Sequence, residues 1–298
     1  MKFGATEEDL TNIDFTLPAD GFTTEKVLTG TKAEKFNVWV GTPKWGAASW
    51  KGKIYPPKIK EGEFLDHYVS IYNAIEFNPT FYKIFTAKVI SKWASKAKHQ
   101  SGFKFCPKFP QAISHVRQLK NAETQTKEFY AGVEVFGDNL GPLFLQLSDN
   151  FSPKGVQYLK DYLTVQPKTH KVCVELRHKD WYVNKKVFED IMHFLYDHQI
   201  GTVISDTAGR RDCMHMNLTT TDAFIRFVGN DLAPSDYTRM DDWVNRIKQW
   251  AEQGLENLYF FVHIDDEQLT PEASIYFIEK LNTTLGTNLQ VPQMLQLF

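Results

Sequence analysis

The sequence predicts a single (β/α)8 barrel of the α/β class, preceded by an N-terminal extension. Its length of 298 residues suits one such barrel, which typically needs about 250 residues, plus an added segment. Apolar strand-like segments alternate with mostly helical connections eight times, and strict alternation favours a parallel sheet. Connections that leave strands are long and those that return are short. This asymmetry is typical of barrels that build a site at the carboxyl rim.

The composition is that of an ordinary globular protein, with 42% hydrophobic and 23% charged residues. The net charge of −2 favours neither nucleic acid nor membranes as a partner. Three cysteines without CxxC spacing indicate structural thiols in a reducing compartment. Acidic Glu7, Glu8 and Asp9 precede any apolar run, and no stretch approaches the roughly 18 apolar residues of a membrane span. We therefore expect a cytoplasmic protein without membrane contact.

Residues 1–36 form the predicted extension, with a short helix at Thr6–Ile13, and residues 37–298 form the barrel domain. Runs of alternating β-branched and apolar residues mark eight strands. The predicted strands are Val38–Thr42, Ala74–Thr80, Gly102–Cys106, Pro142–Leu147, Lys171–Arg177, Gly201–Asp206, Ala223–Gly229 and Asn257–Ile264.

Helix-start signals lie between these strands. Thr86 is a predicted N-cap, and Ser152-Pro153 and Thr270-Pro271 each place proline at a first helical position. A doubly wound open sheet is the alternative fold, but it would usually have a glycine-rich turn after the first strand. The predicted helices are Glu63–Tyr72, Thr86–Ala97, Ala122–Phe136, Pro153–Leu163, Lys185–His198, Asp241–Gln253 and Pro271–Asn282.

The strand at Lys171–Arg177 sets the pattern for a predicted site. Its even-numbered residues are apolar, whereas Glu175 and Arg177 follow Cys173 on the opposite face. Other strands repeat this change from apolar to polar near their carboxyl ends. The polar residues that we assign to the inward face are Glu76, Asn78, Lys104, Gln146, Glu175, Arg177, Asp206, Arg226 and His263.

Burying a charge costs several kcal/mol unless it is paired, so a set of inward charges favours a ligand site. The alternative is a self-satisfied salt-bridge network, such as Glu175 with Arg226, that plugs the barrel. We assign catalysis to four residues, Glu175, Glu76, His263 and Asp206. We assign substrate binding to Arg177, Arg226, Asn78, Tyr82, Lys108, His115, Gln146 and Trp181.

The chain has no nucleophile elbow, zinc-protease helix, phosphate loop or EF-hand loop. In one interpretation, Glu175 or Glu76 is a general acid or base, and Arg177 and Arg226 hold the substrate. In another, carboxylates and an imidazole hold a divalent metal, although the neighbouring arginines already compensate the acids. The candidate metal ligands are Glu76, Glu175, Asp206 and His263.

Several motifs together resemble the domain of unknown function 72 family, the YecE-like proteins. This resemblance implies a (β/α)8 barrel whose biochemical activity is unassigned. The barrel also resembles metal-dependent sugar isomerases and apurinic endonucleases in fold, which does not assign a function. The motifs are V-G-T-x-x-W (40–45), W-K-G-x-x-Y-P (50–56), E-x-N-x-T-F-Y (76–82), G-F-x-F-x-x-K (102–108), I-S-H (113–115), L-G-P-x-x-x-Q-L (140–147), V-E-x-R-H-x-x-W (174–181), S-D (205–206) and R-F-x-G (226–229).

The chain departs from the family pattern in the last two strands. Many members have R-F-H-G where this chain has valine at position 228, so that an imidazole is missing. Many members end the last strand in F-N-N, where this chain has Val262-His263-Ile264-Asp265. One interpretation is that His263 supplies the missing imidazole from the neighbouring strand.

We therefore expect an enzyme of the hydrolase or isomerase class, with acid/base chemistry on a small anionic or polyhydroxylated, sugar-phosphate-like substrate. The alternatives are a nucleic-acid-binding or endonuclease-like protein, using rim aromatics and arginines, and a non-catalytic ligand-binding barrel. No cofactor is identified, and the sequence indicates no oligomeric state.

Overall fold

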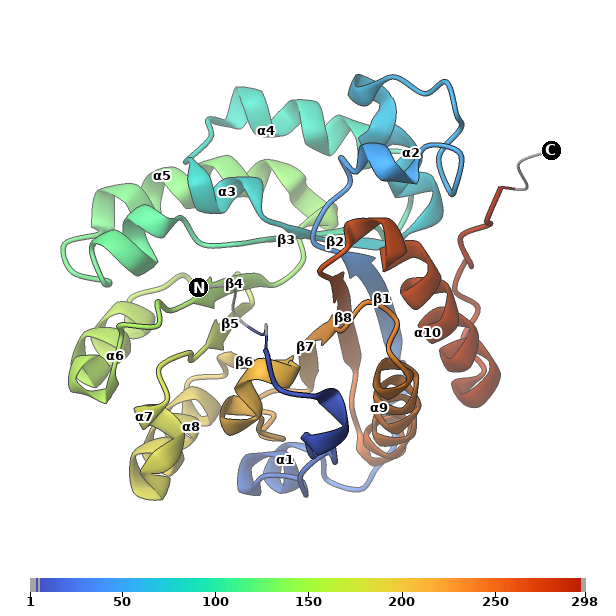
Figure 1. Ribbon diagram of the computed structural model, residues 1–298. Coiled ribbons are helices and arrows are strands. Elements are labelled where there is room, and N and C mark those ends of the chain that lie inside the picture. Colours follow the sequence, from blue (N-terminus) through green and yellow to red (C-terminus); the bar gives the residue numbers. More distant parts are fainter. Residues whose placement is uncertain (1–3, 5, 296–298) are drawn as a thin grey trace.

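In the computed structural model, eight parallel strands form a nearly closed barrel surrounded by helices, which confirms the predicted fold class (Figure 1). The structure describes residue 4 and residues 6–295. Hydrogen-bonded neighbours follow the order β3-β2-β1-β8-β7-β6-β5-β4. The strands are β1 Asn37–Thr42, β2 Ala74–Phe77, β3 Lys104–Pro107, β4 Leu143–Gln146, β5 Val172–Glu175, β6 Gly201–Asp206, β7 Asp222–Gly229 and β8 Asn257–Ile264.

The barrel is strongest on one side and loosest on the other. Strands β7 and β8 pair along their whole length, from Asp222 against Asn257 to Gly229 against Ile264. Between β3 and β4, two isolated bridges, 105 with 140 and 108 with 144, join the edges. The seam therefore closes the barrel with far fewer backbone hydrogen bonds than the opposite side.

The helices occupy the outer layer of the barrel (Figure 1). The predicted extended segment to Thr80 is wrong at its end, because Pro79 starts α3 with proline at the first helical position. Likewise α9 begins at Pro234, well before the predicted start at Asp241. The helices are α1 Phe22–Val27, α2 Phe64–Ile71, α3 Pro79–Tyr82, α4 Ala87–Ala94, α5 Glu123–Val133, α6 Val156–Thr164, α7 Asp180–Val183, α8 Lys185–Asp197, α9 Pro234–Gln253 and α10 Thr270–Leu285. Within the described part of the chain, none of them combines the length and apolarity that crossing a membrane requires.

The N-terminal segment is tied to the outside of the barrel by side-chain hydrogen bonds. The Thr24 hydroxyl donates to the Met216 carbonyl at 2.6 Å and accepts from the Leu218 amide at 2.6 Å. Farther along, Arg246 of α9 donates to Asp20 at 2.7 Å. The predicted helix at Thr6–Ile13 is wrong in extent, since only a 3-10 turn at 10–12 forms there.

The interior of the barrel contains an apolar layer at mid-depth. Every strand from β2 to β8 contributes to this layer. Because side chains alternate between the two faces of a strand, the residue two positions farther along each strand also faces inward. The cluster consists of Ala74, Cys106, Phe144, Cys173, Val203, Phe224, Tyr259 and Phe261. Cys106, Cys173 and Cys213 are free, buried thiols.

Candidate functional site

A layer of polar side chains lies immediately above the apolar layer, toward the carboxyl ends of the strands. Each of its members follows an inward apolar residue by two positions, as Glu76 follows Ala74 and Arg226 follows Phe224. The strand period therefore brings these residues to one level of the barrel. We call this set the polar layer: Glu76, Lys108, Gln146, Glu175, Ser205, Arg226 and His263.

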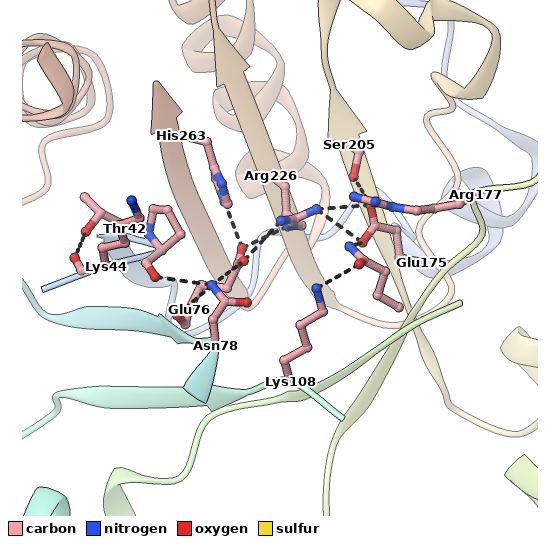
Figure 2. Close-up of polar contacts among 12 residues, drawn as sticks. Thr42, Lys44, Glu76, Asn78, Lys108, Glu175, Arg177, Ser205, Arg226 and His263 are labelled. Carbon is pink, nitrogen blue, oxygen red and sulfur yellow. Dashed lines mark hydrogen bonds and ion pairs between the residues drawn. The ribbon is translucent and has the colours of Figure 1, made fainter. Parts of the chain in front are cut away.

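Arg226 of β7 is the centre of the polar layer and bridges two carboxylates (Figure 2). Its Nε and Nη2 donate to the two oxygens of Glu76 at 2.8 and 3.1 Å. Its Nη1 donates to both oxygens of Glu175 at 3.1 and 3.2 Å. Burial alone would lower the pKa of Arg226, but the two carboxylates outweigh it and raise the pKa above its usual value. The guanidinium is thus permanently charged and fixed in orientation.

Glu76 of β2 is completely buried, and hydrogen bonds occupy both of its oxygens. Besides Arg226, Oε1 accepts from Asn78 Nδ2 at 3.0 Å and Oε2 contacts His263 Nε2 at 2.9 Å. Burial would raise the pKa of Glu76, but Arg226 and His263 outweigh it and hold the pKa well below its usual range. Glu76 is therefore an ionised orienting group and a poor proton acceptor.

Glu175 of β5 has a still denser set of donors. Gln146 Nε2 donates to its Oε2 at 2.6 Å, Ser205 Oγ to its Oε1 at 2.8 Å, and Arg177 Nε to its Oε1 at 3.2 Å. Burial would raise the pKa of Glu175, but Arg177 and Arg226 outweigh it and lower the pKa. Ser205 is the member of this group that the sequence analysis missed.

His263 of β8 differs from the carboxylates because one of its ring nitrogens has no partner in the described part of the chain. Burial lowers the pKa of His263 despite the nearby carboxylate of Glu76. A neutral ring donates to that carboxylate through Nε2–H, which leaves the lone pair on Nδ1. The side chain is 16% exposed. It lies beside Val228 in the β7–β8 register.

Lys108, just beyond β3, is buried between an amide and two aromatic rings. Its Nζ donates to Gln146 Oε1 at 2.7 Å and lies 4.1 Å from the ring centroid of Phe81 and 5.5 Å from that of Phe144. Contact with an aromatic face stabilises an ammonium by about 0.5–2 kcal/mol, less than the several kcal/mol lost on burial. Burial, reinforced by Arg226, accordingly lowers the pKa of Lys108 to about 7.

Three members of the polar layer, Glu76, Arg226 and His263, line a cleft of about 810 Å³ at the carboxyl rim. This volume would accommodate a small organic substrate. A larger cavity of about 920 Å³ lies on the helical layer between α5 and α6, but its lining includes no member of the polar layer. The rim cleft is lined by Pro43, Lys44, Trp45, Gly46, Glu76, Asn78, Pro79, Tyr82, Arg177, Arg226, Val228, His263, Ile264, Asp265 and Glu267.

Asp206 is not part of this site, and its predicted inward orientation is wrong. Its carboxylate faces the outer layer, where Arg239 Nη2 approaches at 2.9 Å and Trp243 Nε1 donates at 2.8 Å. Arg211 also donates to it. Every residue of β6 is buried, and both faces of the strand combine apolar and polar residues. The alternation therefore does not reveal which face points inward. In the structure, Val203 and Ser205 are the inward residues.

Four other predicted or inward-assigned residues have different surroundings. Trp181 is completely buried and its indole donates to the Phe151 carbonyl at 2.8 Å, so its predicted contact with substrate is wrong. Tyr82 is 73% exposed at the cleft. His115 lies against Phe81, and burial together with Lys108 lowers its pKa to about 4. Lys104 starts β3 at the opposite end of the barrel, where its Nζ donates to the Asp138 carbonyl at 2.6 Å.

Among the described residues, no group of three or more His, Cys, Asp or Glu side chains is arranged to hold a metal ion. The predicted ligand set is divided, because Asp206 belongs to another cluster while Glu76 and Glu175 are occupied by Arg226.

Fold and site together define a (β/α)8-barrel protein with a charged cleft at its carboxyl rim. The chain belongs to the family described as protein of unknown function DUF72, whose model matches residues 39–295. It is 26% identical over 283 residues to the UPF0759 protein YecE of Escherichia coli (strain K12), covering 88% of this chain and 100% of that protein. Predicted membership of the DUF72 or YecE-like family is therefore confirmed.

Solved structures of DUF72 family proteins share the fold. One from Thermotoga maritima aligns with a TM-score of 0.65 at 22% identity, covering 84% of this chain and 100% of that chain. Another from Enterococcus faecalis gives 0.63 at 16% identity, covering 85% and 99%. At these identities the likeness supports the barrel architecture and assigns no activity.

Proposed function

We propose that this barrel is an enzyme in which His263 transfers a proton to and from a small substrate bound in the rim cleft. The observation that carries this proposal is the 2.9 Å contact between His263 Nε2 and the buried carboxylate of Glu76. An ionised carboxylate behind an imidazole fixes the tautomer and stabilises the imidazolium that forms on proton uptake. Nδ1 is then the reactive nitrogen.

The two glutamates are less suited to proton transfer than the histidine. Their oxygens already accept hydrogen bonds from arginine, amide, hydroxyl or imidazole groups, and their pKa values are lowered. A carboxylate of low pKa is a weak base and is not protonated near neutral pH, so it cannot serve as an acid there. We therefore assign Glu76 an orienting role and Glu175 a role in holding Arg177 and Arg226.

The cleft favours an anionic or polyhydroxylated substrate. Arg177 and Arg226 lie at its floor, Lys44 at its edge, and Asn78 and Tyr82 add polar and aromatic surface. Guanidinium groups suit carboxylate or phosphate oxygens, and an exposed ring suits the apolar face of a sugar. A plug of self-paired charges is the competing interpretation, but it does not account for the open volume above the polar layer.

The experiment has two parts, beginning with a thermal-shift screen of sugar phosphates and hydroxy acids against the wild-type protein. For each stabilising compound, proton NMR in D2O then follows exchange of the C–H bonds next to its carbonyl or hydroxyl groups. We expect His263→Gln, which preserves the contact to Glu76, to keep the thermal shift. The same substitution should slow exchange by roughly 10²–10⁴-fold, the usual contribution of general acid–base catalysis.

His115→Gln is the matched control, because His115 is a second half-buried histidine of lowered pKa that does not line the cleft. It should leave exchange unchanged. Equal exchange rates in wild type and His263→Gln would overturn the assignment of His263. Failure of every sugar phosphate and hydroxy acid to shift the melting temperature would overturn the substrate class.

One observation supports nucleic acid as the alternative ligand. The ring of Tyr82 is 73% exposed at the cleft, and the side chain of Lys44 is 62% exposed at its edge. Such a pair suits a stacked base and its phosphate. Anisotropy titrations with a single-stranded oligonucleotide would show binding that weakens steeply with salt, and that Tyr82→Ala lowers, if this alternative holds.

A further inference from the structure

The cations of the site differ in their partners. Arg226 is bonded to two carboxylates and Arg177 to one. Lys108, by contrast, has no carboxylate within 4 Å in the described part of the chain, and its hydrogen-bond partner is the neutral oxygen of Gln146. For a buried amine without a counter-ion, no neighbouring opposite charge offsets the cost of burying the charged form, so burial favours the neutral form.

The charged groups around Lys108 act on its pKa in opposite directions. Glu76 and Glu175 favour its protonated form, whereas Arg226 and Arg177 disfavour it, and desolvation is the largest influence. Figure 2 shows the side chain rising from below Arg226 toward the Glu175 side of the cluster. About 8% of the residue remains exposed. Lys108 is not part of the cleft lining, but its Nζ and the guanidinium of Arg226, which does line the cleft, each lie 5.5 Å from the ring centroid of Phe144. Lys108 thus combines surroundings that favour the neutral amine with a position close to Arg226, which lines the cleft.

We propose that Lys108 is a nucleophile that forms an imine with an aldehyde or ketone substrate. The Nζ lone pair attacks the carbonyl carbon, one proton moves from nitrogen to oxygen, and the carbinolamine loses water as the C=N bond forms. The products are one imine and one water molecule, and nothing is oxidised or reduced. Gln146 holds Nζ through one N–H and leaves the lone pair available for attack.

The inference deepens the proposed function and rests on it, because it names the substrates of the same cleft as carbonyl compounds. An open-chain sugar phosphate has both the carbonyl for Lys108 and the anionic group for the arginines. Once the imine forms, its nitrogen draws electrons from the adjacent C–H bond, and His263, which lines the cleft, is the base that would take the proton.

Competitive labelling of the wild-type protein tests the amine without any knowledge of the natural substrate. The folded protein is treated at pH 7 with limiting formaldehyde and sodium cyanoborohydride, and methylation of each lysine is read by peptide mass spectrometry. About half of an amine of pKa 7 is neutral at this pH, against roughly one in 10³ for an ordinary lysine. We expect Lys108 to be labelled at least about tenfold faster than the exposed lysines.

Lys104 is the internal control, since burial also lowers its pKa but it lies at the far end of the barrel and should be labelled slowly once the reagent is limiting. Labelling of Lys108 at or below the rate of the exposed lysines overturns the proposal. This measurement uses no variant, so it does not depend on whether a substituted chain folds.

Trapping with dihydroxyacetone phosphate and cyanoborohydride then separates the two proposals. We expect one adduct on Lys108, lost in Lys108→Arg and retained in His263→Gln and Lys44→Arg. A thermal shift with dihydroxyacetone phosphate but no adduct on Lys108 would refute the imine while leaving the proposed function standing. No shift in the entire sugar phosphate and hydroxy acid screen, with fast formaldehyde labelling of Lys108, would refute the proposed function and leave the nucleophilic amine.

Discussion

Two buried clusters of this protein are each built around an arginine that bridges two carboxylates, but they have opposite surroundings. In the polar layer, Arg226 joins Glu76 and Glu175. Outside the barrel, Arg239 of α9 joins Asp206 and Asp236 at 2.9 and 3.2 Å. We call the second group the outer cluster. Its arginine is completely buried, with its guanidinium 4.8 Å from the ring centroid of Phe15 and 4.4 Å from that of Phe227.

The difference shows that buried charge by itself does not indicate a site. The three charged residues of the outer cluster are completely buried, and Phe15 of the N-terminal segment packs on its arginine. The polar layer borders an open cleft. Among the described residues, its histidine has one ring nitrogen without a partner and its lysine has no carboxylate partner. Open volume and incomplete pairing, more than the number of charges, separate a candidate site from a structural network.

The largest expected effect is the loss of the central cation of the polar layer. Arg226→Met would leave Glu76 and Glu175 buried without their main partner. Removing one member of a buried pair usually costs about 3–5 kcal/mol, so two orphaned carboxylates should cost about 5 kcal/mol or more. Urea unfolding at pH 7 measures this cost. A loss below about 2 kcal/mol would mean that the carboxylates are hydrated from the cleft and that the polar layer is not a buried network.

A smaller loss is expected for the outer cluster. Asp206→Asn keeps the shape of the side chain but removes its charge from beside Arg239, at a cost of about 3 kcal/mol in unfolding free energy. Ligand-induced thermal shifts in the rim cleft should persist in the folded variant. Ser205→Ala, one residue earlier and facing inward, is the matched control and should cost about 1 kcal/mol. Loss of cleft binding in Asp206→Asn would show that the two clusters are coupled.

Lowering the pH should change the free energy of unfolding through groups in both clusters, so it separates them less clearly than the substitutions do. The folded-state pKa of His263 lies below its unfolded value of about 6.5, so the unfolded chain gains the proton first and stability falls as pH drops below about 6.5. The lowered pKa values of Glu76, Glu175 and Asp206 give stability that is complete above about 4.3 and lost below it.

Urea unfolding at pH 7, 5.5 and 4 separates these two windows. His263→Gln should reduce the loss between pH 7 and 5.5, but not abolish it, since His215 also has a lowered pKa of about 4. The steeper loss below pH 4.3 should remain. An identical loss in wild type and His263→Gln over the upper window would contradict the lowered pKa of His263.

The period-two pattern of the sequence predicted most of the barrel and the correct inward face of six strands. It succeeded on β7 and β8 because Arg226 and His263 continue an alternating series of aromatic residues. It failed on β6, where Asp206 and Ser205 are both polar and both buried. Either orientation satisfies the hydrophobic pattern of such a strand. The partners decide between them, with Arg239 and Trp243 outside for Asp206 and Glu175 inside for Ser205.

Other parts of the site depend on three-dimensional pairing that no local pattern contains. The sequence shows Lys108 and Glu175 as candidates, but not that Gln146 stands between them. It shows Trp181 as an aromatic residue in a rim loop, but not that its indole reaches the Phe151 carbonyl. Side-chain hydrogen bonds between distant segments therefore decided which candidates line the cleft.

The contacts of the N-terminal segment bear on how much of the chain belongs to one packed unit. The family match starts at residue 39, yet Phe15 covers the guanidinium of Arg239, and Arg211 donates to the carbonyls of Asp14 and Thr16. A chain cut at the family boundary would leave a hydrated hole against β6 and α9. The packed unit of this protein therefore extends beyond residues 39–295, which the family match covers.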